Sequence, residues 1–161
     1  MTSLTDMLRG AGLAAALAAG LVLSACASHP TPAGMASSAT PGSQQDFVVN
    51  VGDRVFFIVD SSELTPQARS TLDKQAQWLQ MYNRYSFTIE GHADERGTRE
   101  YNLALGARRA QTVRDYLVAR GVDAGRMRTI SYGKERPIAI CDEESCHSQN
   151  RRAMTVLNAS S

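Results

Sequence analysis

The residues best placed to do chemistry in this chain lie at 91–117, in the sequence GHADERGTREYNLALGARRAQTVRDYL. A loop that contains Asp94 leaves a predicted strand and enters a predicted helix, whose free N-terminal amides favour a carboxylate or a phosphate. On that helix Asn102, Leu105 and Arg109 share a face, because residues three, four or seven apart lie on the same side. The stretch therefore suits a small ligand that carries both a positive and a negative charge.

Asp94 and Arg109 supply the two charges that such a ligand needs. A carboxylate accepts hydrogen bonds from an ammonium group, and an arginine pairs with a carboxylate through two parallel hydrogen bonds. Together with the loop amides, the two residues fit the head group of an amino acid. A purely structural ion pair between them is the alternative that spacing leaves open. If they serve the ligand, alanine at either position should remove binding and leave the thermal melt nearly unchanged.

His92, Asp94 and Glu95 also raise the question of a hydrolase or a metal centre, since acids beside a histidine do acid–base work. We do not favour it, because neighbours in a short loop point in different directions and no nucleophile or second histidine stands nearby. We expect no catalytic residue, no metal and no cofactor. His92 is expected to fix the loop by hydrogen bonding.

The elements that must position these residues alternate between strand and helix. A continuous apolar run at 55–59 predicts a strand buried on both faces, and alternation at 86–90 predicts a second strand. Thr65 and Pro66 predict the start of a helix that ends near Tyr82. The later elements are predicted as a helix after the N-cap Thr98 that stops at Gly121, a strand at 127–132, a long loop at 133–146 and a strand at 153–157.

This order predicts an α/β, or α+β, two-layer sandwich whose helix-linked strands are parallel or lie apart in a mixed sheet. The long helix must then bury a second face beside the polar one. Its inward face is expected to consist of Leu103, Ala107, Ala110, Val113 and Leu117.

The N-terminus carries a segment of a different kind. The apolar, alanine- and leucine-rich GAGLAAALAAGLVLSA follows Arg9 and is too short to cross a bilayer comfortably. It ends in Leu-Ser-Ala-Cys, which resembles the lipobox at which bacterial lipoproteins are cut. Residues 1–25 are therefore predicted to be a lipoprotein signal peptide, with Cys26 as the lipidated residue. An ordinary secretory signal and a retained membrane helix are the alternatives.

A linker follows the predicted lipidation site. Residues 27–45 are rich in Ser, Pro, Ala, Gly and Thr and carry almost no charge, which is typical of a flexible tether. About 20 such residues span roughly 25 Å as a coil and roughly 65 Å when stretched. The 161 residues thus divide into a signal peptide, a lipidated linker at 26–46 and one domain at 47–158.

Once Cys26 is lipidated, Cys141 and Cys146 remain as a pair in the sequence CDEESC. In an oxidising compartment they suit a small disulfide-closed loop, which would contribute about 2 kcal/mol of stability. A metal site with the adjacent His147 is the alternative, but two further ligands at suitable spacing are missing.

The charge balance gives no sign of a nucleic-acid partner. The whole chain has a formal net charge of +1, and Asp6 and Arg9 leave together with the signal peptide. Two neighbouring arginine pairs, at 108–109 and 151–152, do not alter this, because only one member of a neighbouring pair on a helix faces a given partner.

Longer motifs resemble the OmpA-like C-terminal domain family, and within it the lipoproteins that associate with peptidoglycan. The resemblance rests on LSAC, on GHADERGTREYN, and on residues 102–117, which follow the pattern N-x-x-L-S-x-x-R-A-x-x-V-x-x-x-L. SYGKERP and NRRAMTV match as well. The resemblance covers about 47–157 and implies a βαβαβ-type domain with a mixed four-stranded sheet.

By this resemblance the domain binds peptidoglycan without covalent attachment, at meso-diaminopimelate. The implied site consists of Asp94 and Arg109 around the head group, Asn102 and Leu105 shaping the pocket, and Asp60 and Ala93 at its rim. Two positions depart from the family pattern. The serine after Leu105 is Gly106, which weakens the helix by up to about 1 kcal/mol, and the acidic residue two positions before Asp60 is Ile58.

The resemblance implies a tether and not an enzyme. The lipid, palmitate among its acyl chains, would hold the protein in the outer membrane, with the domain in the periplasm on the cell wall. It further implies the Tol-Pal system of envelope integrity and cell division, with TolB bound through a surface that overlaps the peptidoglycan site. The alternative is a lipid-anchored periplasmic enzyme that acts on cell-wall peptides.

Overall fold

The computed structural model describes residues 39–158. These residues contain a four-stranded sheet in the order β1-β4-β2-β3. Strand β4 runs antiparallel to both β1 and β2, whereas β2 and β3 are parallel. The strands are β1 (Arg54–Phe56), β2 (Phe87–His92), β3 (Met127–Gly133) and β4 (Arg152–Leu157). The helices are α1 (Gln44–Asp46), α2 (Pro66–Met81), α3 (Arg99–Ala119) and α4 (Glu144–Asn150), with a π-helical turn η1 (Phe47–Gly52) and a 3-10 turn η2 (Ala124–Arg126).

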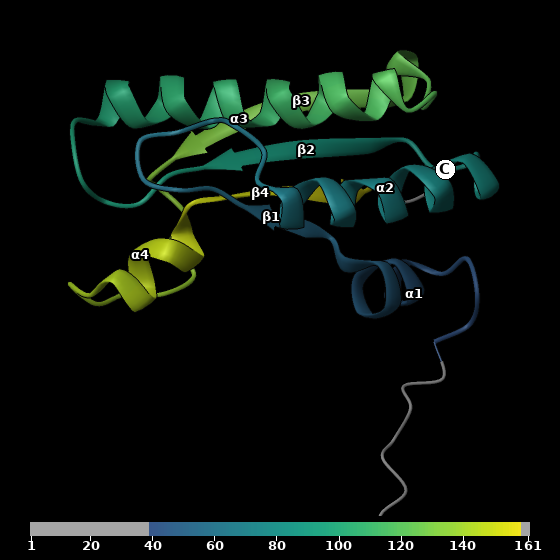
Figure 1. Ribbon diagram of the computed structural model, residues 1–161, viewed down its shortest axis with the longest axis horizontal. Helices are drawn as coiled ribbons and strands as arrows, with labels where there is room; N and C mark the ends of the chain where they lie inside the picture. Colours follow the sequence, from purple (N-terminus) through teal and green to yellow (C-terminus); the bar gives the residue numbers. More distant parts are fainter. Residues whose placement is uncertain (1–38, 159–161) are drawn as a thin grey trace, which may run out of the picture. The chain divides into compact units, whose positions relative to one another are not determined.

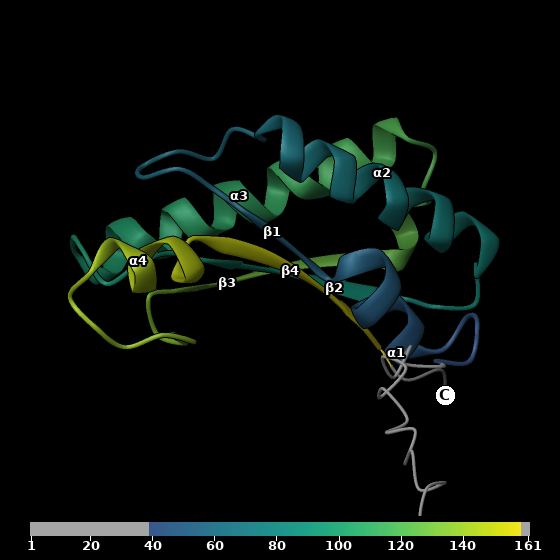
Figure 2. The same ribbon diagram turned by 60° about the horizontal axis from the view of Figure 1, so that its bottom comes forward.

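The helices α2 and α3 lie on one face of the sheet (Figure 1). Figure 2 shows the short helix α4 at the end of the sheet where α3 begins. The two-layer architecture with a mixed sheet is therefore confirmed. The predicted signal peptide, Cys26 and most of the predicted linker lie outside the described residues. Within 39–158, no helix combines the length and the apolar character that crossing a membrane requires.

Both long helices begin where the sequence predicts. The hydroxyl of Thr65 accepts from the amide of Ala68 at 3.1 Å, and that of Thr98 accepts from the amide of Tyr101 at 3.1 Å. These contacts satisfy amides that have no partner within the helix. After α3, Gly121 takes a φ of 88°, a left-handed conformation in which glycine commonly ends a helix.

The first strand differs from the prediction. β1 is three residues long and forms an edge of the sheet, so it has one strand neighbour and one face covered by helix. Val55 is buried, whereas Phe56, Ile58 and Val59 expose 46%, 58% and 55% of their surface. The prediction of a strand buried on both faces is wrong because the apolar run leaves the sheet after Phe56.

The buried face of α3 is also rotated from the expected one. Leu103 is 39% exposed and Ala107 is exposed, so the prediction of both as core residues is wrong. The helix instead buries the polar side chains of Asn102 and Arg109 along with its apolar stripe. A second local difference is α4, which occupies the end of the predicted long loop and continues beyond it.

Gly106 lets α3 approach the sheet closely. A Cβ at Gly91 of β2 would stand 1.8 Å from the carbonyl oxygen of Gly106, and a Cβ at Gly106 would stand 2.8 Å from that of Gly91 and 2.4 Å from Ser131 Oγ. The hydroxyl of Ser131 occupies this space and donates to Leu103 O at 2.7 Å. Gly106 is therefore a packing position, and its cost to helix propensity is not its main effect.

Residues 42–46, which the sequence assigned to the linker, pack on the domain. The Tyr85 hydroxyl donates to Gly42 O at 2.8 Å, and Trp78 Nε1 donates to Asp46 Oδ2 at 2.8 Å. Trp78 is buried in an aromatic cluster that also contains Phe47, Tyr82 and Tyr85. This cluster closes the end of the domain opposite the candidate site.

Candidate ligand-binding site

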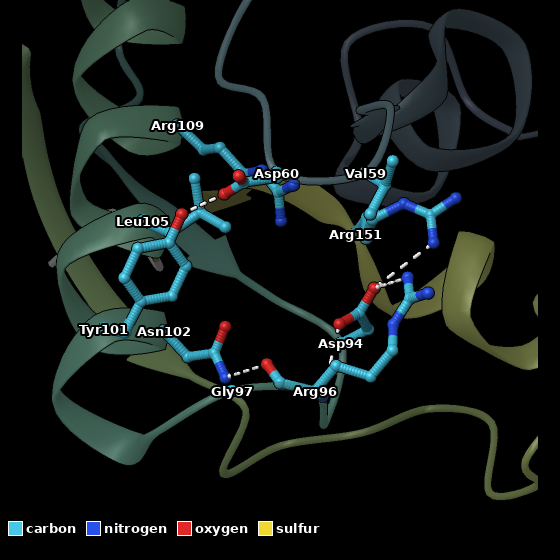
Figure 3. A pocket seen from close by; sticks show the side chains of 10 residues that line it. All are labelled: Val59, Asp60, Asp94, Arg96, Gly97, Tyr101, Asn102, Leu105, Arg109 and Arg151. Carbon is cyan, nitrogen blue, oxygen red and sulfur yellow. Dashed lines mark hydrogen bonds and ion pairs between the residues drawn. The ribbon is translucent and has the colours of Figure 1, made fainter.

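A pocket of about 250 Å³ lies beside the first turns of α3 (Figure 3). Its wall combines that helix with the loop after β1, the loop after β2 and the residue before β4. The lining residues are Val59, Asp60, Asp94, Arg96, Gly97, Tyr101, Asn102, Leu105, Arg109 and Arg151. The structure therefore brings together every residue of the implied peptidoglycan site except Ala93. Ala93 is buried, and its amide donates to Gly133 O at 2.8 Å.

Arg109 forms the back of the pocket with a side chain that is 0% exposed. Its guanidinium donates to three backbone carbonyls: His92 O at 2.7 Å, Ser61 O at 2.8 Å and Ile58 O at 3.2 Å. Among the described residues no carboxylate lies within ion-pair distance of it. Burial lowers the pKa of Arg109 to about 10, so the group stays charged at neutral pH. A buried positive charge with neutral partners attracts an anion.

Ile58, the departure from the family pattern nearest this site, contributes through its backbone. Its carbonyl accepts from Arg109, and its side chain is 58% exposed. Any residue type supplies that carbonyl, so the missing acidic side chain leaves the hydrogen bonds of Arg109 intact.

Asp94 is paired with two other arginines. Arg96 Nη2 lies 2.5 Å and Arg151 Nη1 lies 3.2 Å from Asp94 Oδ2. Burial on its own would raise the pKa of Asp94, but the hydrogen bonds from Arg96 and Arg151 outweigh it and hold that pKa below its usual range. Asp94 is therefore a carboxylate at neutral pH, and the structural ion pair with Arg109 that the spacing allowed is not the pairing found.

These contacts revise the expectation that alanine at Asp94 or Arg109 leaves the thermal melt nearly unchanged. Alanine at Arg109 would strip three buried carbonyls of their donor, and alanine at Asp94 would leave the buried Arg151 short of a partner. Losses of this kind cost several kcal/mol. Both residues support the fold as well as the pocket.

Arg151 is a pocket residue that sequence reasoning missed. Its Nε donates to Phe57 O at 3.1 Å, and its terminal nitrogens reach Asp94 and Glu144. The motif NRR matched the family pattern but gave no partner, because two of the groups that Arg151 binds, Phe57 O and Asp94, come from segments far away in the sequence. Tyr101 was missed in the same way: its hydroxyl donates to Asp60, whose φ of 53° places it in the left-handed region.

The backbone of the loop after β2 is held from two sides. Asn102 Nδ2 donates to Arg96 O at 2.7 Å, which gives the spacing between Asn102 and the loop a physical reason. Lys134 Nζ donates to Glu95 O at 3.1 Å and to Gly97 O at 2.8 Å. The pocket wall is thus positioned by side chains from α3 and from the segment after β3.

Sequence comparison identifies the family to which this architecture belongs. Residues 56–151 match the OmpA family. The chain belongs to the OmpA family. Within it, the chain groups with the peptidoglycan-associated lipoproteins: that of Rhizobium meliloti (strain 1021) is 64% identical over 149 residues, covering 88% of this chain and 85% of the relative. The one from Brucella melitensis is 63% identical over 153 residues, 91% of each chain.

Two solved structures agree with the fold. The crystal structure of the peptidoglycan-associated lipoprotein from Burkholderia pseudomallei superposes with a TM-score of 0.64 at 42% identity, covering 66% of this chain and 90% of that one. The C-terminal domain of Helicobacter pylori MotB gives a TM-score of 0.62 at 23% identity, covering 66% of this chain and 84% of that one. The latter likeness concerns the fold alone.

His92 plays a different part in this OmpA-family domain from the one expected. Its ring is 2% exposed, and neither ring nitrogen has a hydrogen-bond partner among the described residues. The prediction that its side chain fixes the loop by hydrogen bonding is therefore wrong; its backbone carbonyl does so by accepting from Arg109. Burial, followed by the charges of Arg152 and Arg136, lowers the pKa of His92 to about 4. The ring is thus neutral at pH 7.

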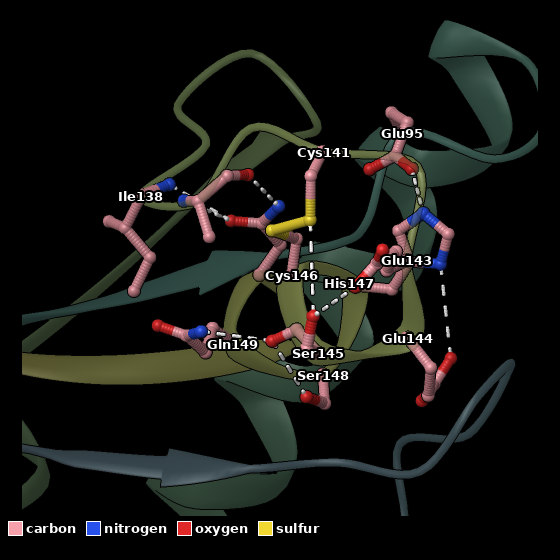
Figure 4. Close-up of a disulfide and its surroundings, with 12 residues drawn as sticks. Glu95, Ile138, Cys141, Glu143, Glu144, Ser145, Cys146, His147, Ser148 and Gln149 are labelled. Carbon is pink, nitrogen blue, oxygen red and sulfur yellow. Dashed lines mark hydrogen bonds and ion pairs between the residues drawn. A yellow bond between two sulfur atoms is a disulfide. The ribbon is translucent and has the colours of Figure 1, made fainter.

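A disulfide joins Cys141, which lies before α4, to Cys146, which lies within α4 (Figure 4). Figure 4 shows His147 of this helix between Glu95 and Glu144, and both contacts are ion pairs when the histidine is protonated. In the part of the chain that the structure describes, no three His, Cys, Asp or Glu side chains are grouped so as to hold a metal ion. Helix α4 therefore supports the pocket loop through the charged contact between His147 and Glu95.

Proposed function

We propose that this chain binds peptidoglycan non-covalently, at the meso-diaminopimelate of the peptide stem. The observation that carries the proposal is the presence, in one pocket, of a carboxylate at Asp94 and of the buried, carbonyl-bound guanidinium of Arg109. A head group that has one ammonium and one carboxylate complements both charges. The name of the relatives, peptidoglycan-associated lipoproteins, supports peptidoglycan as the partner.

In this proposal each side chain has one task. Asp94 accepts from the ammonium group, and Arg109 with the amides at the start of α3 attracts the carboxylate. Asn102 holds the loop backbone, Leu105 forms an apolar wall, and Asp60 lies at the rim. Ala93 is buried and does not line the pocket.

We propose binding without catalysis. The lining residues include no serine or cysteine that could act as a nucleophile. The carboxylate of Asp94 is tied up by two arginines, which suits charge recognition better than proton transfer. The rival function, hydrolysis of cell-wall peptides, needs such a group within reach of the bound stem.

Sedimentation with purified cell-wall sacculi tests the function. The protein should pellet with the sacculi, free meso-diaminopimelate should release it, and the muropeptides should remain intact. Soluble fragments released from the sacculi would favour the enzyme instead.

Variants then test the site assignment. Asp94→Asn keeps the shape and removes the charge, and Arg109→Lys keeps the charge and loses the planar fork, so both should reduce pelleting at least tenfold. Arg108→Ala, at the exposed neighbour of Arg109, is the matched control. Folded Asp94→Asn and Arg109→Lys proteins that pellet like the wild type would rule the assignment out.

We also propose the cellular setting that the sequence implies. A lipid on Cys26, with palmitate among its chains, holds the protein in the outer membrane with its domain in the periplasm, within the Tol-Pal system of envelope integrity and cell division. Cys26→Ser should move the protein from the membrane fraction to the soluble fraction; retention in the membrane would contradict lipidation.

TolB is the proposed protein partner, through a surface that overlaps the pocket. Val59 both lines the pocket and exposes 55% of its surface, and Ile58 beside it is 58% exposed. Exposed apolar side chains at the mouth of a polar pocket are suited to a protein partner. TolB should therefore release the protein from sacculi, and simultaneous binding of both would contradict the overlap.

A further inference from the structure

Two arginines share one oxygen of Asp94, and they differ in how firmly they are held. The Arg151 side chain is 6% exposed and has further acceptors in Phe57 O and Glu144. The Arg96 side chain is 46% exposed, and its guanidinium lies 2.5 Å from Asp94 Oδ2. Figure 3 shows both arginines pointing at Asp94. Because Arg96 is the more exposed of the two, a ligand that approaches from solvent meets Arg96 first.

The guanidinium of Arg96 can leave Asp94 without disturbing the loop. The backbone around it is held by Asn102, which donates to Arg96 O at 2.7 Å, and by Lys134, which donates to the carbonyls on either side. None of these bonds involves the Arg96 side chain. A rotamer change at an exposed arginine is fast compared with loop motion.

Glu144 offers a second acceptor for the guanidinium of Arg96. Glu144 Oε2 of α4 lies 3.8 Å from Arg96 Nη2, and the Glu144 side chain is 65% exposed. The Arg96 guanidinium thus stands between two carboxylates and can exchange one for the other over a short path. Because the Arg96 side chain is 46% exposed, solvent weakens its pairing with Asp94, so the exchange costs little.

We propose that Arg96 competes with the ligand for Asp94: an incoming ammonium group displaces the guanidinium, which moves to Glu144. The inference rests on the proposed function and adds a specificity device to that site. One cation replaces another, so Asp94 keeps its neutralising partner throughout. A ligand without an ammonium group has nothing to put in place of Arg96 and meets a covered carboxylate.

Calorimetry with two ligands tests the competition. The probes are a tripeptide stem that ends in meso-diaminopimelate with its terminal ammonium group free, and the same peptide with that nitrogen acetylated. For Arg96→Gln, the free-ammonium peptide should bind about two- to fivefold more tightly than to the wild type, the range that an exposed ion pair supplies. The acetylated peptide should bind both proteins equally.

Arg99→Gln is the matched control. Arg99 is an exposed arginine three residues away whose partner is Glu135 at 3.2 Å, outside the pocket lining. Its replacement should change neither affinity. If Arg96→Gln weakens both peptides, Arg96 grips the ligand or supports the loop, and the competition is refuted; an unchanged affinity for the free-ammonium peptide refutes it as well.

A double-mutant cycle with Glu144→Gln tests the second position. Without this carboxylate the displaced guanidinium loses its acceptor, so Glu144→Gln should weaken the free-ammonium peptide in the wild-type background and not in the Arg96→Gln background. Equal weakening in both backgrounds would show that Glu144 acts through Arg151 instead. If the wild type binds neither peptide, the proposed function fails; if it binds and Arg96→Gln does not tighten binding, only the role of Arg96 fails.

Discussion

Two buried arginines meet at the candidate pocket, and the structure satisfies them in opposite ways. Within residues 39–158, Arg109 on α3 donates only to the carbonyls of Ile58, Ser61 and His92. Arg151, just before β4, pairs with the carboxylates of Asp94 and Glu144 and donates to one carbonyl. They are 0% and 5% exposed, so the difference lies in their partners and not in their burial.

The comparison separates two uses of the same side chain. Carbonyl partners satisfy the N–H groups of Arg109 and leave its net charge in place, which keeps a positive potential in the pocket. Carboxylate partners neutralise Arg151 and in return hold Asp94 as a carboxylate at a fixed position. The first arginine is suited to attract a ligand anion, and the second to position the group that receives a ligand cation.

The largest effect is expected from removing Arg109. Arg109→Met should lower the free energy of unfolding by about 3–5 kcal/mol, because three buried carbonyls lose their donor at once. Urea unfolding measures the change, and Arg108→Met, on the exposed neighbour, should stay within about 0.5 kcal/mol of the wild type. A loss below about 1 kcal/mol would mean that water or other groups replace the guanidinium, and the contrast with Arg151 would disappear.

Removing Arg151 should lower the free energy of unfolding slightly less, and a second substitution should restore part of the loss. Arg151→Met leaves the buried Asp94 with one exposed partner, at a cost of about 2–4 kcal/mol. Adding Asp94→Asn should restore about 1 kcal/mol, because the uncompensated charge is gone. The same Asp94→Asn change should not rescue Arg109→Met. Equal behaviour of the two double variants in urea unfolding would erase the distinction between the arginines.

The smallest effect concerns the pH dependence of stability, through His92, whose backbone carbonyl accepts from Arg109. His92 has an ordinary pKa of 6.5 in the unfolded chain and about 4 in the folded one, so the unfolded chain binds the proton first. The free energy of unfolding should therefore have its full value above pH 6.5 and fall by about 2–3 kcal/mol as the pH drops toward 4.

Urea unfolding at stepped pH values checks this prediction. His92→Phe should abolish the slope between pH 6.5 and about 4.5, where the lowered pKa values of Asp94 and Glu144 do not yet contribute. An unchanged slope in His92→Phe would assign the acid sensitivity to another group.

Local patterns were enough to predict most of the secondary structure. The caps at Thr65 and Thr98 and the glycine at 121 act within one turn of the chain, so their neighbours in sequence determine them. Burial of an element depends on what packs against it. For that reason the run at 55–59, whose composition suits a central strand, was misassigned, and the structure makes it a short edge strand followed by a pocket loop.

The candidate site shows the same difference between what local sequence patterns predict and what tertiary packing decides. The sequence by itself was enough to predict that Asp94 and Arg109 line one pocket, because they stand on a loop and a helix that follow each other directly. Only the tertiary structure decided their partners: Arg151 stands just before β4, 57 residues after Asp94, and the carbonyls of Ile58 and Ser61 come from the loop before α2. Charge pairing at short range follows from where whole elements pack, and helical spacing carries no information about that.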